Sequence, residues 1–64
     1  MNRVNCFKLA RMRHGMSQKE AAIKMSVSAP YLSRIEHGEI VVSPRVLRLM
    51  RDLYEDQTLT QGSF

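Results

Sequence analysis

The stretch SQKEAAIKMSVSAPYLSRIEHG, residues 17–38, contains two short helical patterns with a break between them. Ser17 is followed three positions later by Glu20, which is the spacing of a capping box at the start of a helix. Residues 26–28, Ser-Val-Ser, interrupt the helical spacing, and Pro30 then stands in a first helical turn, where its missing N–H is tolerated. The stretch therefore predicts two helices joined by a three-residue turn.

The second of these helices, at about residues 28–37, has two different sides. Leu32 and Ile35 share an apolar side that is expected to pack inward. Ala22 provides a small side chain where the two helices cross, and Val27 fills the turn. Such a pair is the unit that places one helix in the DNA major groove. The side left free to meet bases carries Ala29, Pro30, Tyr31, Ser33 and Arg34.

A further helix is predicted before this pair. Its apolar face includes Phe7 and Ala10, and Gly15 ends it, as glycine commonly does after a last helical turn. Asn2 or Asn5 is the expected cap at its start.

Another helix is predicted after the pair, beginning at Ser43 and Pro44, a cap followed by proline at the first helical position. Residues 57–64 are expected to form a short polar tail with at most one more turn. The prediction is a compact all-α domain of four to five helices. Its expected core is Phe7, Ala10, Ala22, Met25, Val27, Leu32, Ile35, Leu47, Met50 and Leu53.

The chain has 64 residues and a formal net charge of +4. Residues 1–38 contain seven basic and two acidic side chains, whereas residues 39–64 contain three basic and four acidic ones. The positive excess therefore lies in the half that contains the helix pair. This distribution favours an anionic partner such as nucleic acid, although a solvated basic surface would have the same composition.

Several other classes of protein are excluded by the sequence. Cys6 is the single cysteine, so it is expected to be a buried small side chain and forms no disulfide framework or cysteine-based zinc site. His14 and His37 have no acidic neighbours at metal-ligand spacing. No nucleophile–base set or glycine-rich phosphate loop is present, so neither an enzyme nor a cofactor is expected. No apolar run approaches the ~20 residues of a membrane span, and a cytoplasmic location is expected.

The combined pattern resembles a known family. The segments RMRHGMSQKEAA (Arg11–Ala22), VSAPYLSRIEHG (Val27–Gly38) and SPRVLRLM from Ser43 are similar to the phage repressor and Cro family of helix-turn-helix regulators, also called XRE-like. The resemblance covers residues 5–54. It implies a lambda-repressor-like DNA-binding domain over residues 1–56, with the helix-turn-helix at about 17–37.

The resemblance also implies roles for individual residues. Arg11 and Glu36 match the family's structural ion pair, which joins the first helix to the base-reading helix. Base contacts fall to Ala29, Pro30, Tyr31, Arg34 and, secondarily, Ser33. Arg34 is the strongest of these, because a guanidinium pairs bidentately with guanine. Phosphate contacts are expected from Ser17, Gln18, Lys19, His37 and Arg45.

Some positions depart from the family pattern or keep two interpretations. Ser26 stands where the turn usually has glycine, so a positive φ is expected there at a strain of up to ~1 kcal/mol. Residues 39–42, Glu-Ile-Val-Val, replace a loop that is often basic, and these apolar residues either pack on the core or meet a partner. Tyr31 either contacts DNA or packs, and Arg34 could be only a solvated side chain.

The sequence thus predicts a sequence-specific double-stranded-DNA-binding regulator, specifically a repressor that binds a two-fold operator as a homodimer. The dimer surface is predicted to contain Leu53, Tyr54, Leu59 and Phe64. The main alternative is a protein-interaction module on the same fold, such as an antitoxin. A nonspecific nucleic-acid binder is a second alternative, and its affinity would depend steeply on salt.

Overall fold

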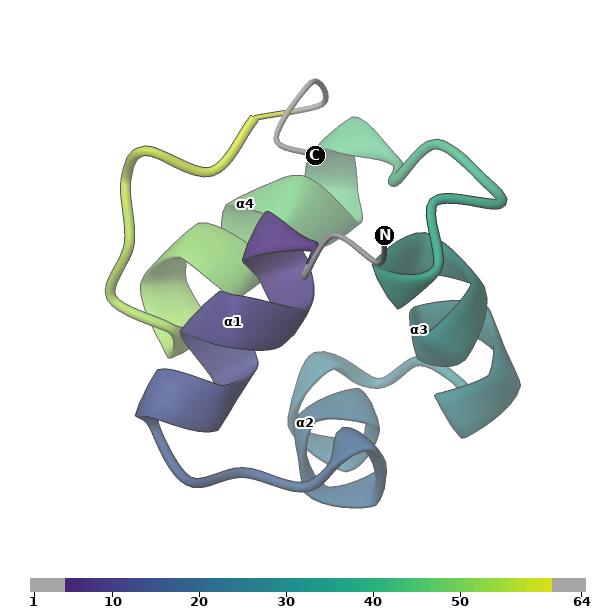
Figure 1. The fold of residues 1–64 in the computed structure, drawn as a ribbon, viewed down its shortest axis with the longest axis horizontal. Coiled ribbons are helices and arrows are strands. Elements are labelled where there is room, and N and C mark those ends of the chain that lie inside the picture. The colour runs from purple at the N-terminus through teal and green to yellow at the C-terminus, as the bar shows by residue number, and fades with distance from the viewer. Residues whose placement is uncertain (1–4, 61–64) are drawn as a thin grey trace.

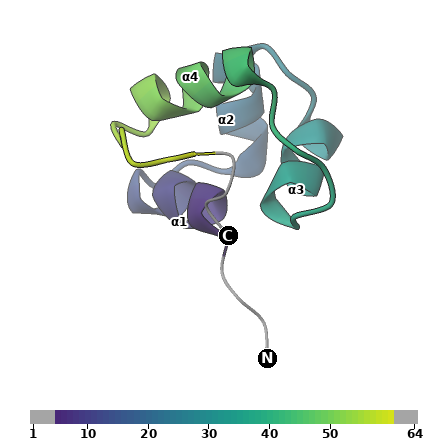
Figure 2. The ribbon, with the colours of Figure 1, turned by 90° about the horizontal axis from the view of Figure 1, so that it is seen from above.

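Four helices form the part of the chain that the computed structural model describes, residues 5–60. They are α1 (Cys6–Arg13), α2 (Gln18–Met25), α3 (Ala29–Glu36) and α4 (Pro44–Leu53). No strand occurs between residues 5 and 60, and the predicted all-α fold is confirmed. Helix α2 packs against α3 and α4, and α1 packs against α3. In Figures 1 and 2, α3 lies at one side of the molecule and the turn that follows α4 lies at the opposite side.

Each helix begins with a side chain that caps it. The four caps are Asn5, Ser17, Ser28 and Ser43. Each side-chain oxygen accepts a hydrogen bond from a backbone N–H that the helix itself leaves unpaired. The predicted starts are therefore confirmed, with Asn5 as the first cap, while Asn2 lies outside the described residues. The helix predicted at about 28–37 corresponds to α3 together with its two cap residues.

The core contains most of the predicted residues and several others. Phe7, Ala10, Ala22, Met25, Leu32, Ile35, Leu47 and Met50 are buried, as predicted. Val27 and Leu53 are only half-buried against this core, so the prediction of full burial was wrong for them. The core also includes Ala21, Val42, Val46, Tyr54 and Leu59.

The chain after α4 folds back onto its own domain. Tyr54 and Leu59 are each only 2% exposed, and the Nε atom of Arg51 donates a hydrogen bond to the Leu59 carbonyl at 2.7 Å. The turn that starts this return has Glu55 at φ 51°. The predicted dimer surface was therefore wrong for Tyr54 and Leu59, because both side chains are used inside one chain. Phe64 lies outside the described residues, and residues 57–60 form no fifth helix.

Cys6 is exposed rather than buried, contrary to the expectation from the sequence. It is the first residue of α1, and Phe7 and Ala10 form the inward side of that helix. Leu9, three positions after Cys6, is also exposed. Side chains three positions apart share one face of a helix. Cys6 therefore lies on the outer face of α1, beside Leu9.

Candidate nucleic-acid interface

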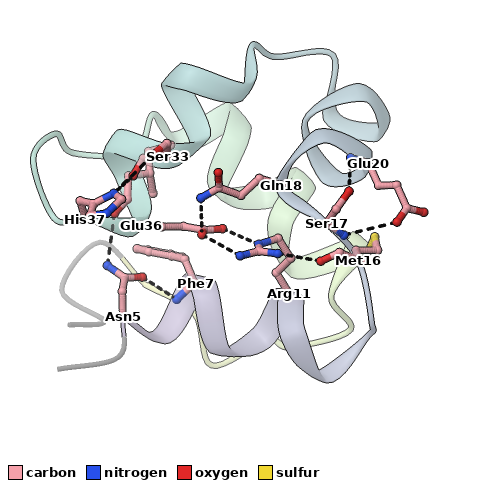
Figure 3. A network of polar contacts seen from close by, with 11 residues as sticks. Asn5, Phe7, Arg11, Met16, Ser17, Gln18, Glu20, Ser33, Glu36 and His37 are labelled. Carbon is pink, nitrogen blue, oxygen red and sulfur yellow. Dashed lines mark hydrogen bonds and ion pairs between the residues drawn. The ribbon is translucent and has the colours of Figure 1, made fainter. Parts of the chain in front are cut away.

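The start of α2 is fixed by a reciprocal pair of hydrogen bonds. The Oγ of Ser17 accepts from the backbone N–H of Glu20 at 3.0 Å, and the Oε1 of Glu20 accepts from the N–H of Ser17 at 3.3 Å. Both contacts, shown in Figure 3, form the capping box expected from the spacing of these residues. The beginning of α2, with Lys19 exposed in its first turn, is therefore well defined.

The turn between α2 and α3 depends on a residue in the left-handed region. Ser26 has φ 57° and ψ 40°, which is the positive φ expected at this position. The backbone N–H groups of Ser26 and Val27 donate to carbonyls of the last turn of α2, at 3.1 and 2.9 Å. These hydrogen bonds end α2 at once, so only three residues separate α2 from α3.

The inner side of α3, residues Leu32, Ile35 and Glu36, is buried against the rest of the domain. Arg11 forms a bidentate pair with Glu36, from Nε to Oε2 at 2.8 Å and from Nη2 to Oε1 at 3.0 Å. Its Nη1 donates to the Met16 carbonyl at 2.7 Å, so the guanidinium also holds the loop before α2. The hydrogen bonds to Glu36 raise the pKa of Arg11 above its usual value. The structure thus joins α1, α3 and the loop before α2 through one buried cation (Figure 3).

Gln18 also contacts this ion pair. Its Nε2 donates to the Oε1 of Glu36 at 2.9 Å, and its side chain is half-buried. The Glu36 carboxylate therefore accepts three hydrogen bonds, two from Arg11 and one from Gln18, and Figure 3 shows all three meeting there. The phosphate contact expected of Gln18 would have to form while its amide nitrogen is occupied, or after that bond breaks.

Two more residues near this network were not recognised as part of it in the sequence. The Nδ2 of Asn5 donates to the Ile35 carbonyl at 3.2 Å, which links the start of α1 to the end of α3. Tyr54 is buried beside the ion pair, and its Oη has no hydrogen-bond partner among the described residues. The pKa of Tyr54 is raised to about 12, mainly by burial and to a smaller extent by the negative charge of Glu36. No pairwise spacing predicts these contacts, because they join segments far apart in the chain.

The outer side of α3 consists of the five predicted base-reading residues, Ala29, Pro30, Tyr31, Ser33 and Arg34. Pro30 and Arg34 are exposed, and the other three are half-buried. Tyr31 packs against the core, and its Oη accepts from the Ser43 N–H at 3.5 Å. This geometry favours the packing interpretation of Tyr31 over a base contact.

The remaining polar groups of the outer side differ in how free they are. The Oγ of Ser33 lies 3.4 Å from the Nδ1 of His37, and the same nitrogen lies 2.7 Å from the Ser33 carbonyl. Arg34 has no side-chain hydrogen bond or ion pair to any described residue. It is therefore the one side chain on the outer side whose hydrogen-bonding groups all remain available.

The predicted phosphate-binding residues lie at several helix ends. Ser17 and Lys19 are at the start of α2, His37 follows α3, and Arg45 is in the first turn of α4. All four are exposed, unlike Gln18. The backbone N–H groups at a helix start carry a partial positive charge that favours phosphate. The four side chains are exposed to solvent, and none of them forms a hydrogen bond with another of the four.

The loop between α3 and α4 divides its apolar residues between the core and the solvent. Val42 is buried and Ile40 is half-buried, whereas Val41 is 73% exposed. Val42 thus packs on the core, which is one of the two interpretations of this loop, and Val41 is exposed to solvent.

Residues 5–60 contain no group of three or more side chains that could together hold a metal ion. No helix in this range is both long enough and apolar enough to cross a membrane.

Comparison with known proteins agrees with this arrangement of helices. A family model described as a helix-turn-helix domain matches residues 5–56. This range covers all four helices and both partners of the buried ion pair. No curated protein and no solved structure matches the chain.

Proposed function

Because the chain belongs to the helix-turn-helix domain family over residues 5–56, we propose that it is a sequence-specific regulator of transcription that binds double-stranded DNA. In this proposal α3 enters the major groove with its outer side toward the bases. The observation that carries it is the contrast between the two sides of α3. The inner side is fixed by Arg11 and Gln18, whereas Arg34 on the outer side is exposed and has no side-chain partner among residues 5–60.

Exposed polar groups around α3 support the same orientation. Ser17 and Lys19 at the start of α2, and Arg45 in the first turn of α4, are available to bind phosphates. Phosphate contacts fix the position of such a domain on DNA, whereas base contacts give specificity. Gln18 has a different role in this proposal: it holds Glu36, and its Oε1 remains available to accept a hydrogen bond.

We propose further that the protein acts as a repressor and that two copies bind a two-fold operator. A single domain of this size makes few base contacts, whereas specific affinities are typically ~10⁻⁸ M or better. Two copies on half-sites about one helical turn apart would supply the missing contacts. Val41 is the exposed apolar side chain of the α3–α4 loop, and it replaces Tyr54 and Leu59 as a candidate for contact between the copies.

The test is selection from a pool of random duplexes with the wild-type protein and two variants. Arg34→Ala removes the unpaired guanidinium of α3. Arg13→Ala removes the same charge from the other side of the molecule. There, the hydrogen bonds from Thr58 are the main cause of the lowered pKa of Asp56, and the charge of Arg13 is a smaller cause. We expect a two-fold motif with the wild-type protein and with Arg13→Ala, and loss of one base preference with Arg34→Ala.

Other outcomes would support the alternatives. Retention of duplexes without any motif, and only at low salt, would indicate a nonspecific binder. No retention at all would favour the protein-interaction module, for which the exposed Leu9 and Met12 of α1 offer an apolar surface. A motif without two-fold symmetry would contradict the dimer and leave the DNA-binding proposal intact.

A further inference from the structure

The hydrogen-bonding side chains at the start of α3 are two hydroxyls, and each of them already accepts one hydrogen bond. The Oγ of Ser28 accepts the N–H of Tyr31 at 3.2 Å, and the Oη of Tyr31 accepts from Ser43. Ala29 and Pro30 have no polar side-chain atom. One turn later, Ser33 contacts His37, whereas the Arg34 side chain has no hydrogen bond or ion pair to a described residue. This surface therefore offers one strong set of donors and one apolar patch, formed by Ala29 and Pro30.

Each of these two features fits one kind of group in the major groove. A guanidinium has only donors, and guanine presents two acceptors, O6 and N7, at a spacing that a guanidinium matches. Adenine and cytosine both present an amino donor there, and a side-chain acceptor is needed to read it. An apolar contact recognises the 5-methyl group of a pyrimidine.

The distance between the two features limits where these bases lie. Pro30 and Arg34 are four residues apart in α3, so they share a face and are separated by about 6 Å along the helix. Stacked bases are about 3.4 Å apart along one strand. The two recognised bases are therefore within about two base pairs of each other.

We infer that each half-site contains a guanine bound by Arg34 and, within two base pairs of it, a 5-methylpyrimidine that contacts Ala29 and Pro30. This inference rests on the proposed function, and it specifies the DNA that the protein prefers. The outer side of α3 has no second charged or amide side chain to read the remaining positions of the half-site. Their preferences come from DNA shape and deformability.

The test uses the duplex recovered by selection, synthesised again with single modified bases. Replacing the guanine by 7-deazaguanine removes N7, and we expect affinity to fall about fivefold to tenfold. Inosine keeps O6 and N7 in the major groove, so it is the matched control and is expected to bind nearly as well. With Arg34→Ala, the effect of 7-deazaguanine should disappear. Because Arg34→Ala must still bind the duplex for this comparison, the loss of base reading is distinguished from misfolding of the variant.

The methyl contact has its own pair of duplexes. Replacing thymine by deoxyuridine removes only the 5-methyl group, and we expect affinity to fall about fourfold. If the contact is to the methyl group itself, 5-methylcytosine at that position should bind better than cytosine by a similar factor. Equal binding of thymine and deoxyuridine, or of the two cytosines, would overturn this part of the inference.

The failures of the two proposals are distinguishable. A pool that yields no motif refutes the DNA-reading function, and the inference falls with it. A clear motif that lacks guanine, or in which 7-deazaguanine has no effect, refutes the inference alone.

Discussion

The inner and outer sides of α3 differ in burial and in hydrogen bonding, although they belong to the same eight residues. On the inner side, Glu36 is buried and accepts three hydrogen bonds from α1 and α2. On the outer side, Arg34 is exposed and makes no side-chain hydrogen bond to a described residue. The inner side fixes where the helix is, whereas on the outer side the Arg34 guanidinium is exposed to solvent.

The comparison is clearest between two arginines. All three guanidinium nitrogens of Arg11 donate hydrogen bonds inside the protein, to Glu36 and to the Met16 carbonyl. Arg34 has the same side chain and none of these contacts. Their chemistry is identical, so burial and partners decide that one is structural and the other is available for binding. The predictions below test this separation in order of decreasing effect.

The largest effect is expected from Arg11→Met. This change leaves the buried Glu36 without its cation, and the free energy of unfolding should fall by about 3–5 kcal/mol. A domain of this length has only about 3–10 kcal/mol in total, so urea denaturation followed by circular dichroism should show little or no cooperative transition. Arg34→Ala, the matched control, should change stability by less than about 0.5 kcal/mol.

A double variant separates the loss of the pair from the burial of a charge. In Arg11→Met with Glu36→Leu, no buried charge remains, so much of the stability should return. An Arg11→Met protein that unfolds with almost wild-type stability would contradict the assignment of this pair as the main link between α1 and α3.

The second effect concerns Tyr54 at high pH. Burial and the charge of Glu36 raise its pKa to about 12, whereas an unfolded tyrosine titrates near 10. Between these values the unfolded chain loses the proton and the folded protein keeps it. As pH rises from 10 to 12, Tyr54 therefore lowers the free energy of unfolding by up to about 1.4 kcal/mol per pH unit.

Tyr54→Phe removes this contribution, and its stability should decline less steeply than that of the wild type above pH 10. Tyr31→Phe, which removes a tyrosine hydroxyl from the outer side of α3, is the control for the substitution itself. The measurement is the urea midpoint at a series of pH values. Parallel slopes for Tyr54→Phe and the wild type would show that Tyr54 is not held in its neutral form.

The sequence predicts the fold well because local signals mark each element. Ser17 and Glu20 define the start of α2, Ser43 and Pro44 define the start of α4, and the structure has these helices where they were expected. The spacing of Leu32 and Ile35 identifies the inner side of α3. Caps and periodicity act over a few residues, so they can be read without knowing the rest of the structure.

The contacts that position the site were less accessible from the sequence. The pair Arg11 and Glu36 came from a family resemblance, since 25 residues separate the two and no local pattern links them. From the sequence alone, Tyr54 is predicted on a dimer surface, because no local pattern gives this apolar residue a partner within the domain. Its burial depends on the left-handed turn at Glu55, which glycine or asparagine would have indicated and glutamate does not.

The third effect is smaller and concerns Gln18→Ala. The variant removes one of the three hydrogen bonds to Glu36, and the free energy of unfolding should fall by about 1 kcal/mol. Lys19→Ala, at the next and exposed position, should leave stability unchanged within about 0.5 kcal/mol. A stability change for neither variant, with weaker DNA binding for Gln18→Ala, would indicate that Gln18 serves phosphate binding and not the inner side of α3.

The smallest effect is expected at the turn that joins α2 to α3. Ser26 has a positive φ, which is strained for a residue with a Cβ, and Ser26→Gly relieves this strain. The unfolded chain also gains freedom with glycine, so the net stabilisation should be only about 0.5 kcal/mol. Ser26→Ala keeps the Cβ and should give no increase, which makes it the matched control. If Ser26→Gly stabilises the domain without changing the selected DNA motif, then the position of α3 is set by its inner contacts. If the motif changes, the backbone of the turn itself helps to orient the outer side, and the separation of the two sides is incomplete.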